Sequence, residues 1–323
     1  MKIAITGANG FVGSNLVKHF LSAGYEVRAI VRSNAFTTFI SPRAQIVKVN
    51  YYDAQSLISA FTGIDIIIHN AGKTKALNSG QMFKANLGIT EKIIEAINKL
   101  PEEQQLIYFS SQAASRPSID NIPVKEDEPS APVTWYGKSK FAAEKAIKEK
   151  CRKNYTIIRP CSIYGCGDKD FLQVFKLVNR GFGFKIGRKD KLINMIYVLE
   201  LCRFVELCVN NPAAYSQTFF ATDGKVYKQS DVIKAVAKAL NKKPVTITVP
   251  EFLACLIFYA GDLYGRLFHK EVVTNREKMK EIMADAWLAD TEKAIRILGW
   301  KPTTNLENNL KETAKCYHDL GWL

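Results

Sequence analysis

A glycine-rich turn near the start of the chain constrains its fold more than any other feature. Gly7, Gly10 and Gly13 follow the apolar run Lys2–Thr6 and open segment 11–23, whose apolar residues recur at helical spacing. In a strand–turn–helix unit of this kind, free N–H groups at the start of the helix can bind a pyrophosphate. The first glycine permits the tight turn, the second lets the backbone approach the phosphates, and the third lets helix and strand pack closely. The turn therefore predicts a dinucleotide-binding unit, and a purely structural glycine turn is the alternative.

Strand-like and helix-like patterns alternate over the first half of the chain. After Lys2–Thr6, apolar strands are expected at 27–31, Gln45–Val49, 65–69, Gln105–Phe109 and 156–158, and amphipathic helices at 82–100 and 136–150. Continuous apolar strands separated by helices are typical of a parallel sheet that is covered on both faces. The expected fold class is therefore α/β, with a Rossmann doubly wound parallel sheet.

The rhythm of the pattern changes after Pro160. Glycine-containing stretches at 181–184 and 187–191 are interpreted as connections, a helix is expected at 196–209 and a strand at Gln217–Ala221, and the C-terminal third is mostly helical in pattern. We therefore expect residues 1–165 and 192–221 to form the dinucleotide-binding domain. Residues 166–191 and 222–323 are expected to form a smaller, mostly helical substrate domain.

The end of the second expected strand indicates which cofactor the unit holds. Units that bind NAD usually place Asp or Glu there, where the carboxylate bonds the 2′-hydroxyl of the ribose. This chain has Arg32 followed by Ser33, with no acid at that point. A guanidinium can bind a 2′-phosphate through two charge-assisted hydrogen bonds, whereas a carboxylate would repel it. The sequence therefore favours NADP as the cofactor, with NAD, and Arg32 as a simple surface charge, as the alternative.

A Tyr-x-x-x-Lys pattern lies at the start of the helix expected at 136–150. Tyr136 and Lys140 are four residues apart, so they lie one above the other on the same helix face. An ammonium near a phenol favours the phenolate and is expected to lower the pKa of Tyr136 from its usual value of about 10. Ser110 and Ser111 close the fifth expected strand, where a hydroxyl can hold a substrate oxygen beside the phenol. This set of groups is suited to proton exchange with an alcohol or a ketone.

Taken together, these motifs resemble the extended short-chain dehydrogenase/reductase family, also described as the NAD-dependent epimerase/dehydratase family, across nearly the whole chain. The matching segments are TGANGFVG at 6–13, HNAG at 69–72, FSSQAA at 109–114, YGKSK at 136–140, RPCSIYGCGD at 159–168 and LGWKP at 298–302. Segment 24–32 is similar to the NADP-binding strand of the dihydroflavonol reductase and 3β-hydroxysteroid dehydrogenase-like branch. The resemblance implies a nicotinamide-dependent enzyme that requires no metal.

The resemblance also implies roles for individual residues. Tyr136 is expected to be the general acid/base, Lys140 to bind the nicotinamide ribose and tune Tyr136, and Ser111 to polarise the substrate carbonyl. The cofactor is expected to contact Gly7, Gly10, Phe11, Val12, Gly13, Arg32, Asn50, Tyr51, Asn70, Ala71, Gly72, Tyr136, Lys140, Pro160 and Ile163. Asn50 and Tyr51 stand where relatives usually carry Asp-Leu against adenine, which is a departure from the family pattern.

The implied reaction is hydride transfer between the nicotinamide and a ketone or secondary alcohol of a small, partly apolar substrate. Residues 112–114 follow Ser111 and read QAA where sugar-nucleotide dehydratases carry acids, so dehydration is disfavoured. Nucleotide-sugar epimerases hold NAD and commonly carry an Arg that meets the diphosphate. Segment 192–200 has no such Arg, although Arg188 and Lys189 stand slightly earlier. A redox-neutral epimerase is therefore the alternative, followed by a protein that binds NADP(H) as a sensor without catalysis.

Charge and cysteine content limit the other classes of function. Lys and Arg outnumber Asp and Glu by 45 to 31, a net charge of +14, but the basic residues are dispersed, so no nucleic-acid partner is expected. The seven cysteines show neither CxxC pairs nor metal-binding spacing, which predicts a reduced, metal-free, cytoplasmic protein with Cys161 and Cys166 as small buried residues. The helices that begin near Phe83 and Tyr136 resemble those of a family dimer interface, so a homodimer is expected.

An apolar stretch, 252–264, lies in the C-terminal part and is too short for a membrane span. Together with Phe171, Phe175, Phe182 and Phe184 it is a candidate lining of an apolar substrate pocket, although ordinary core or dimer packing is the favoured interpretation. An amphipathic lid or a peripheral membrane contact is a further alternative for the same stretch.

Overall fold

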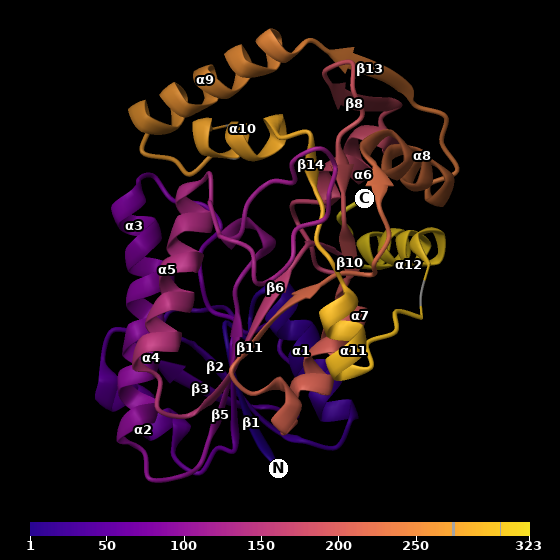
Figure 1. Ribbon diagram of the computed structural model, residues 1–323. Coiled ribbons are helices and arrows are strands. Elements are labelled where there is room, and N and C mark those ends of the chain that lie inside the picture. The colour runs from indigo at the N-terminus through magenta and orange to yellow at the C-terminus, as the bar shows by residue number, and fades with distance from the viewer. Residues whose placement is uncertain (273–274, 304) are drawn as a thin grey trace.

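The computed structural model describes residues 1–272, 275–303 and 305–323. Its central sheet has seven parallel strands in the order β11-β6-β5-β4-β1-β2-β3 (Figure 1). They are β1 (Lys2–Thr6), β2 (Glu26–Arg32), β3 (Gln45–Val49), β4 (Ile66–His69), β5 (Gln105–Phe109), β6 (Asn154–Pro160) and β11 (Gln217–Ala221). Each predicted strand of this sheet is present, with ends that differ by at most two residues. The predicted doubly wound α/β fold is therefore confirmed.

Helices cover both faces of the sheet. α1 (Phe11–Ser22), α7 (Val198–Cys208) and α11 (Glu292–Leu298) lie on one face, and α2 (Ala54–Phe61), α4 (Ile89–Lys99) and α5 (Trp135–Lys150) lie on the other (Figure 1). Alternate side chains of β1 point to the two faces. Ile3 and Ile5 belong to the core cluster that contains Phe20 of α1, whereas Ala4 belongs to the cluster that contains Ile93 of α4. The core of this part thus consists of two apolar layers with the sheet between them.

The helix predicted at 82–100 contains a wider turn. α3 (Ser79–Phe83) continues into a π-helical turn, Lys84–Gly88, and then into α4. π-helical turns within α-helices occur frequently at functional sites. The apolar periodicity of the sequence predicts the helix but not the turn, because a single extra residue barely disturbs the pattern.

A second, smaller region lies above the sheet in Figure 1. Its described strands are β7 (Ser162–Tyr164) with β10 (Met195–Tyr197), β9 (Leu192–Ile193) with β12 (Tyr227–Lys228) and β14 (Ala286–Trp287), and β8 (Phe182–Ile186) with β13 (Val245–Val249). Its helices are α6 (Leu172–Asn179), α8 (Gln229–Ala239), α9 (Glu251–Leu267), α10 (Arg276–Met283) and α12 (Leu306–Asp319). The mostly helical character expected of the C-terminal part is confirmed.

Residues 181–184 include a strand, so their interpretation as a connection is wrong. Phe182–Ile186 forms β8, which pairs in parallel with β13. Gly183 is buried, and a Cβ at this position would lie 2.8 Å from Cγ2 of Ile233 in α8. The glycine therefore allows a strand and a helix to approach closely, and a glycine signal in a sequence does not separate this use from a loop.

The prediction for the cysteines is wrong at Cys166. This residue forms a disulfide with Cys316 of α12, which lies 150 residues further along the chain. α12 lies against the loop that follows β7, where the Tyr317 hydroxyl donates to the carbonyl O of Asp168 at 2.7 Å. The pair depends on where the last helix returns in the fold, so cysteine spacing alone does not reveal it. Cys161 is buried, as predicted.

The aromatic and apolar residues singled out in the C-terminal part lie in two different environments. Phe175 is fully buried and Phe171 is partly buried in the core cluster of the smaller region. Phe182 and Phe184 are exposed, and so is most of α9, which contains the apolar stretch 252–264. Core packing within the chain therefore accounts for Ala254 and Phe258 of this stretch and does not account for its exposed side chains. None of the helices formed by the described residues has the length and apolar character needed to cross a membrane.

Candidate active site

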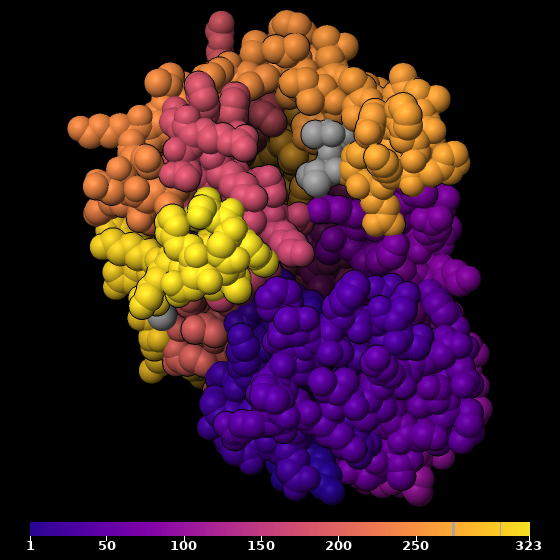
Figure 2. Space-filling view, turned by 180° about the vertical axis from the view of Figure 1, so that it is seen from behind, coloured from indigo at the N-terminus to yellow at the C-terminus, as the bar shows by residue number. Residues whose placement is uncertain are grey.

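A cavity of about 1080 Å³ opens at the carboxyl ends of β1, β2, β4, β5 and β6. It lies where the indigo and purple segments of Figure 2 meet the pink and yellow segments. Its lining includes Gly7, Gly10, Phe11, Val12, Arg32, Asn50, Tyr51, Asn70, Ala71, Gly72, Ser111, Tyr136, Lys140, Pro160 and Ile163. The structure thus brings together every residue predicted to be catalytic or cofactor-binding except Gly13, which is buried beneath the turn.

The glycine turn has the close packing expected of a phosphate-binding loop. Gly7 has a φ of +65°, and a Cβ at this position would lie 2.9 Å from the Cα of Ala71. A Cβ at Gly13 would lie 2.1 Å from the carbonyl O of Gly7, so the helix can pack under the turn only with glycine here. The backbone of the turn therefore forms the cavity wall directly, next to the free N–H groups at the start of α1.

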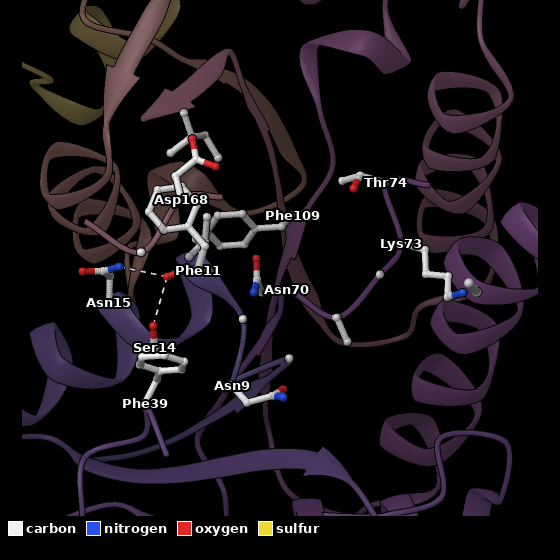
Figure 3. A pocket seen from close by; sticks show the side chains of 18 of the residues that line it. Asn9, Phe11, Ser14, Asn15, Phe39, Asn70, Lys73, Thr74, Phe109 and Asp168 are labelled. Carbon is white, nitrogen blue, oxygen red and sulfur yellow. Dashed lines mark hydrogen bonds between the residues drawn. The ribbon is translucent and has the colours of Figure 1, made fainter. Parts of the chain in front are cut away.

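Side chains of α1 hold its first turn in place. Ser14 Oγ and Asn15 Nδ2 donate to the carbonyl O of Phe11 at 3.1 and 2.8 Å, as Figure 3 shows. Asn15 Nδ2 also donates to the carbonyl O of Cys166 at 3.2 Å. The start of α1 is thereby linked to the loop after β7, on the opposite wall of the cavity. Asn15 was not among the residues predicted to line the cavity.

The end of β2 forms one end of the cavity. Arg32, Ser33 and Asn34 line it together with Lys18 of α1. Arg32 and Lys18 are exposed, and neither forms an ion pair with another residue that the structure describes. Two positive charges are therefore free to meet an anion at this end. Arg32 was predicted for this place, whereas Lys18, Ser33 and Asn34 were not.

Tyr51 connects β2 with the glycine turn. Its hydroxyl donates to the carbonyl O of Ile30 at 3.0 Å and accepts from the backbone N–H of Gly7 at 3.2 Å. Burial raises the pKa of Tyr51 to about 12, so the hydroxyl is protonated at neutral pH. The departure from the family pattern at Asn50 and Tyr51 thus supplies a hydroxyl that joins two walls of the cavity.

The Ser, Tyr and Lys of the predicted set meet where α5 approaches the end of β5. Thr134 caps α5, and its Oγ1 accepts from the N–H of Gly137 at 3.0 Å. A Cβ at Gly137 would lie 2.0 Å from the carbonyl O of Ala113, so glycine lets the helix approach the segment after Ser111. As a result Tyr136 and Ser111 line the same part of the cavity.

Lys140 lies one turn further along the same helix face. Its Nζ donates to the carbonyl O of Phe109 at 2.7 Å and lies 4.9 Å from the ring centre of Tyr108. Burial lowers the pKa of Lys140 to about 8, and the nearby Glu144 carboxylate raises it. The ammonium is therefore held inside the cavity wall rather than in solvent.

The pKa of Tyr136 is raised, whereas the sequence predicts that it is lowered. Burial raises it to about 12, the hydrogen bond with Ser111 lowers it and the Glu281 carboxylate raises it. The predicted lowering by Lys140 is therefore wrong for the free protein, because loss of hydration of the phenolate is the largest influence. Glu281 belongs to α10, so a residue of the smaller region acts on the predicted catalytic tyrosine.

A buried ion pair fixes α5 against the sheet. Arg159 of β6 donates through Nε and Nη2 to the two carboxylate oxygens of Glu144 at 2.9 and 2.7 Å. The Ser110 hydroxyl donates to Oε1 of Glu144 at 2.5 Å. Both charged side chains are almost completely buried. A two-point contact of this kind fixes orientation as well as distance, so it holds the helix that carries Tyr136.

The π-helical turn brings a further polar side chain to this part of the molecule. Asn86 Oδ1 accepts from the N–H of Lys73 at 2.8 Å, and Asn86 Nδ2 donates to Ser139 Oγ at 2.8 Å. Asn86 therefore ties the loop after β4, which lines the cavity, to α5. Asn86 was not predicted, although a polar residue on the apolar face of a predicted helix was an available signal.

A second cavity, of about 250 Å³, adjoins the first at Ser111, Tyr136, Pro160 and Cys161, which line both. Its other walls are Gln112, Ala113, Ser162, Lys191, Leu192, Ile193, Gln229, Glu281, Ile282, Ala284 and Trp287. The residues considered as a candidate pocket lining line neither cavity, because their side chains face the core or the outer surface; they are Phe171, Phe175, Phe182, Phe184 and 252–264. The apolar part of the wall consists instead of Trp287 and aliphatic side chains.

Two buried polar side chains in the second cavity were not predicted. Lys191 Nζ donates to the carbonyl O of Met283 at 3.0 Å and pairs with Asp285 at 3.2 Å. Gln112 is buried, and its Nε2 has no hydrogen-bond partner among the described residues. An unpaired buried amide donor is unfavourable, so Gln112 Nε2 is suited to bind an oxygen atom of a ligand. In the sequence, Gln112 was noted only because it is not an acid.

The sequence of this chain is similar to those of known proteins. Residues 3–216 match the NAD dependent epimerase/dehydratase family. The chain is 26% identical over 330 residues to a UDP-glucose 4-epimerase of Vibrio cholerae, with 98% of this chain and 95% of that protein covered. It is 24% identical over 281 residues to a decarboxylating sterol-4-alpha-carboxylate 3-dehydrogenase of Dictyostelium discoideum, with 83% and 85% covered.

The fold is shared with solved structures over the full length of the chain. A UDP-glucose 4-epimerase of Thermotoga maritima, solved with UDP-glucose, has a TM-score of 0.82 at 18% identity and covers 99% of both chains. The relatives include an epimerase and a dehydrogenase, so the fold alone does not select one reaction. The protein is an NAD(P)-dependent enzyme with the extended short-chain dehydrogenase/reductase fold, and it belongs to the NAD dependent epimerase/dehydratase family.

Proposed function

We propose that the protein is an NADP(H)-dependent oxidoreductase that interconverts a ketone and a secondary alcohol. The observation that carries the proposal is the position of Ser111 and Tyr136, which line both cavities where these meet. A substrate oxygen bound there by the two hydroxyls lies at the mouth of the larger cavity. The smaller cavity then receives the rest of a small, partly apolar substrate.

The larger cavity is suited to a dinucleotide. Its glycine turn lets backbone atoms form the wall, since a Cβ at Gly7 would be 2.9 Å from the Cα of Ala71. The proposed contacts with the dinucleotide include Gly10, Phe11 and Val12 at the helix start, where free N–H groups favour phosphates. When bound, the nicotinamide supplies or accepts the hydride.

The residues of the chain then have three tasks in the proposed reaction. Tyr136 gives its Oη proton to the substrate oxygen during ketone reduction and takes it back during alcohol oxidation. Ser111 donates a hydrogen bond to the same oxygen, where negative charge develops. Lys140 binds the nicotinamide ribose and keeps a positive charge near the phenol. A tyrosine whose pKa is raised to about 12 in the free protein is protonated at neutral pH, which suits the reductive direction.

The preference for NADP rests on the end of β2. Arg32 and Lys18 line the cavity there and form no ion pair with the other described residues. A 2′-phosphate would find one guanidinium and one ammonium at this place, together with the hydroxyl of Ser33. NAD has no group that uses these charges, so it stays the alternative cofactor.

The proposal is tested by following the cofactor with purified full-length protein. Sterol-type ketones, flavonoid-like ketones and UDP-sugars are each incubated with NADPH and with NAD. Consumption of NADPH in proportion to a reduced ketone supports the oxidoreductase. Conversion of a UDP-sugar without net change of NAD would refute it and establish an epimerase.

The epimerase is the second candidate function because two of the similar proteins described above carry that name. A diphosphate in the substrate cavity would call for free positive charge. Lys191 is the cation of that cavity, and its Nζ lies 3.2 Å from Asp285 and 3.7 Å from Glu251. Arg188 and Lys189 line neither cavity. These contacts favour the oxidoreductase over the epimerase, and the assembled Ser–Tyr–Lys set favours an enzyme over a sensor.

We further propose that the protein is a cytoplasmic homodimer and that its two domains have the bounds predicted from the sequence. Residues 1–165 and 192–221 would hold the cofactor, and residues 166–191 and 222–323 would form the substrate domain. The partner copy would pack on α4 and α5. Light scattering of the purified protein tests the dimer, and a monomer at micromolar concentration would refute it.

A further inference from the structure

Helix α9 turns a narrow face inward, and most of its large apolar residues face outward. Ala254, Phe258 and Gly265 are its buried positions. A Cβ at Gly265 would lie 2.9 Å from the carbonyl O of Lys270, so this inner face needs a glycine to pack. The usual surface helix of a water-soluble domain has the opposite arrangement, with its large apolar side chains facing the core.

The outward face of α9 is a continuous apolar stripe. Phe252, Leu256, Leu263 and Leu267 are exposed by 70, 60, 59 and 67%. They recur three and four residues apart with Tyr259 between them, so they lie along one side of the helix. Leu253, Ile257, Tyr264 and Phe268 form a second exposed row beside the first. Exposed apolar patches of this extent mark sites of interaction with other molecules or with membranes.

Exposed apolar side chains also lie on the two-stranded ribbon of β8 and β13, and β13 directly precedes α9 in the chain. Val245 pairs with Phe182, and Ile247 pairs with Phe184, so these four side chains lie on the same face of the ribbon. All four are exposed, whereas Gly183 on the other face packs against α8. α9 and the ribbon together form the end of the molecule opposite the N-terminus (Figure 1). We call the exposed apolar residues of α9 and of this ribbon the apolar end face.

Positive charges flank the apolar end face on both sides. Arg188 and Lys189 follow Gly187, which lies against Glu251 at the start of α9, and Lys242 and Lys243 precede β13. All four basic side chains are exposed, and none forms an ion pair within the described part of the chain. Lys242 and Lys243 therefore lie at one end of the ribbon, and Arg188 and Lys189 lie at its other end, next to the start of α9.

The other end of α9 is basic as well. Arg266 and Arg276 share a single carboxylate, that of Asp262, at 2.9 and 3.4 Å. Exposed Lys270 follows the helix and pairs with no described acid. Excess positive charge therefore lies at both ends of the apolar stripe. This arrangement complements a surface that is anionic outside and apolar inside.

We propose that the apolar end face docks on the surface of a bilayer that contains anionic phospholipids. α9 has 17 residues, a length of about 26 Å, and its ends are charged, so it fits flat in the interface and does not cross the bilayer. Tyr259 and Tyr264 have the amphipathic character favoured at the level of the headgroups. A two-fold contact with a second copy of the chain is the less favourable occupant, because it would bring the two basic rims together.

The docking surface does not depend on which reaction the active site performs. It lies next to the substrate side of the molecule, because α9 contacts α10 and α10 contributes Glu281 and Ile282 to the second cavity. Membrane docking would therefore bring that cavity near the lipid surface.

Co-sedimentation of the full-length protein with vesicles tests the proposal. Vesicles of phosphatidylcholine alone are compared with vesicles that also contain phosphatidylglycerol. We expect binding that increases with the phosphatidylglycerol fraction and decreases with added NaCl, as for any contact with basic side chains at its rim. The L256E/L263E variant should bind at least roughly tenfold more weakly, since it loses two apolar contacts and adds two negative charges. The K242E/K243E variant leaves the apolar residues in place and should lose mainly the dependence on phosphatidylglycerol.

The control variant I119E/I122E carries the same two charge changes at exposed isoleucines outside the apolar end face and should bind as the wild type does. NADPH affinity and the thermal unfolding midpoint of each variant report whether the fold is intact. Absence of vesicle binding by the wild type, or equal binding by L256E/L263E, would overturn the proposal. A wild-type dimer that becomes monomeric in L256E/L263E, with no vesicle binding by either, would overturn it in favour of self-association.

Discussion

The two cavities that meet at Tyr136 are built in different ways. The larger one takes much of its wall from backbone atoms and short loops at the ends of β1, β2, β4 and β5, within a contiguous stretch of the N-terminal part. The smaller one is formed mainly by side chains from distant segments, such as Gln112, Lys191, Glu281 and Trp287. Binding in the first depends on backbone geometry together with the basic side chains at the end of β2, and binding in the second depends on a few individual side chains.

Because the two cavities are built in different ways, cofactor binding and substrate choice can change independently of each other. Substitutions in the larger cavity should change the cofactor and leave the choice of substrate intact. Substitutions in the smaller cavity should change the substrate and leave cofactor affinity intact. The residues shared by both cavities, together with Lys140 of the proposed catalytic set, should affect every reaction of the protein.

Tyr136→Phe is the largest expected effect, because Tyr136 lines both cavities. We expect kcat to fall by about 10²- to 10⁴-fold with every ketone that the wild type reduces, since the proton donor is lost. NADPH affinity, measured by fluorescence titration, should change by less than about twofold, because a phenyl ring fills almost the same space. Tyr215→Phe is the matched control, on the turn before β11 and outside both cavities. Unchanged turnover in Tyr136→Phe would remove the tyrosine from the mechanism.

Arg32→Ala addresses the larger cavity alone. Loss of a guanidinium that bonds a phosphate is expected to raise the Kd for NADPH by about 10- to 100-fold and to leave the Kd for NADH nearly unchanged. Isothermal titration with each nucleotide measures both values. Arg152→Ala, at an exposed arginine far along the chain, serves as the control. Equal weakening of the two nucleotides would contradict a contact with the 2′-phosphate and would favour NAD.

The larger cavity could be predicted from the sequence, and the smaller cavity could not. The glycine turn, the strands of the sheet and the Tyr136–Lys140 pair depend on neighbours within a few residues, so spacing and periodicity identify them. The other members of the predicted set follow from the resemblance to the family, and nearly all of the set lines one cavity in the structure. Gly13 does not line the cavity, but it provides the close packing of helix and turn that was predicted for the third glycine.

The second cavity escaped prediction because it depends on long-range packing. Lys191 and Trp287 meet through the pairing of β9 with β14, which joins segments about 95 residues apart and involves only two residues of each strand. Glu281 and Tyr136 belong to α10 and α5, which are far apart in the sequence and line the same cavity in the structure. Short strands and surface helices leave only weak periodic signals in a sequence. The aromatic residues that were noted in the sequence lie in the core or on the outer surface and not in the second cavity.

Gln112→Leu addresses the smaller cavity alone. The amide Nε2 has no partner among the described residues, so its replacement by an apolar group should not lower the free energy of unfolding. A substrate that uses this donor should show a KM about 5- to 20-fold higher, while NADPH affinity stays constant. Gln173→Leu, at an exposed glutamine of α6, is the control. A change in NADPH affinity without a change in KM would contradict the separation of the two cavities.

Glu281→Gln is the smallest expected effect and tests whether the smaller region acts on the catalytic tyrosine. The Glu281 carboxylate raises the pKa of Tyr136, so its neutralisation should lower that pKa, by less than about one unit because burial is the larger influence. In the oxidative direction the ionised tyrosine accepts the proton, so the rise of kcat/KM with pH should begin at lower pH in the variant. In the reductive direction the protonated tyrosine is required, so activity should be lost at lower pH. Glu281→Asp keeps the charge and should retain the wild-type profile. A Glu281→Gln profile that coincides with the wild type in both directions would mean that α10 shapes the cavity without acting on the proton transfer.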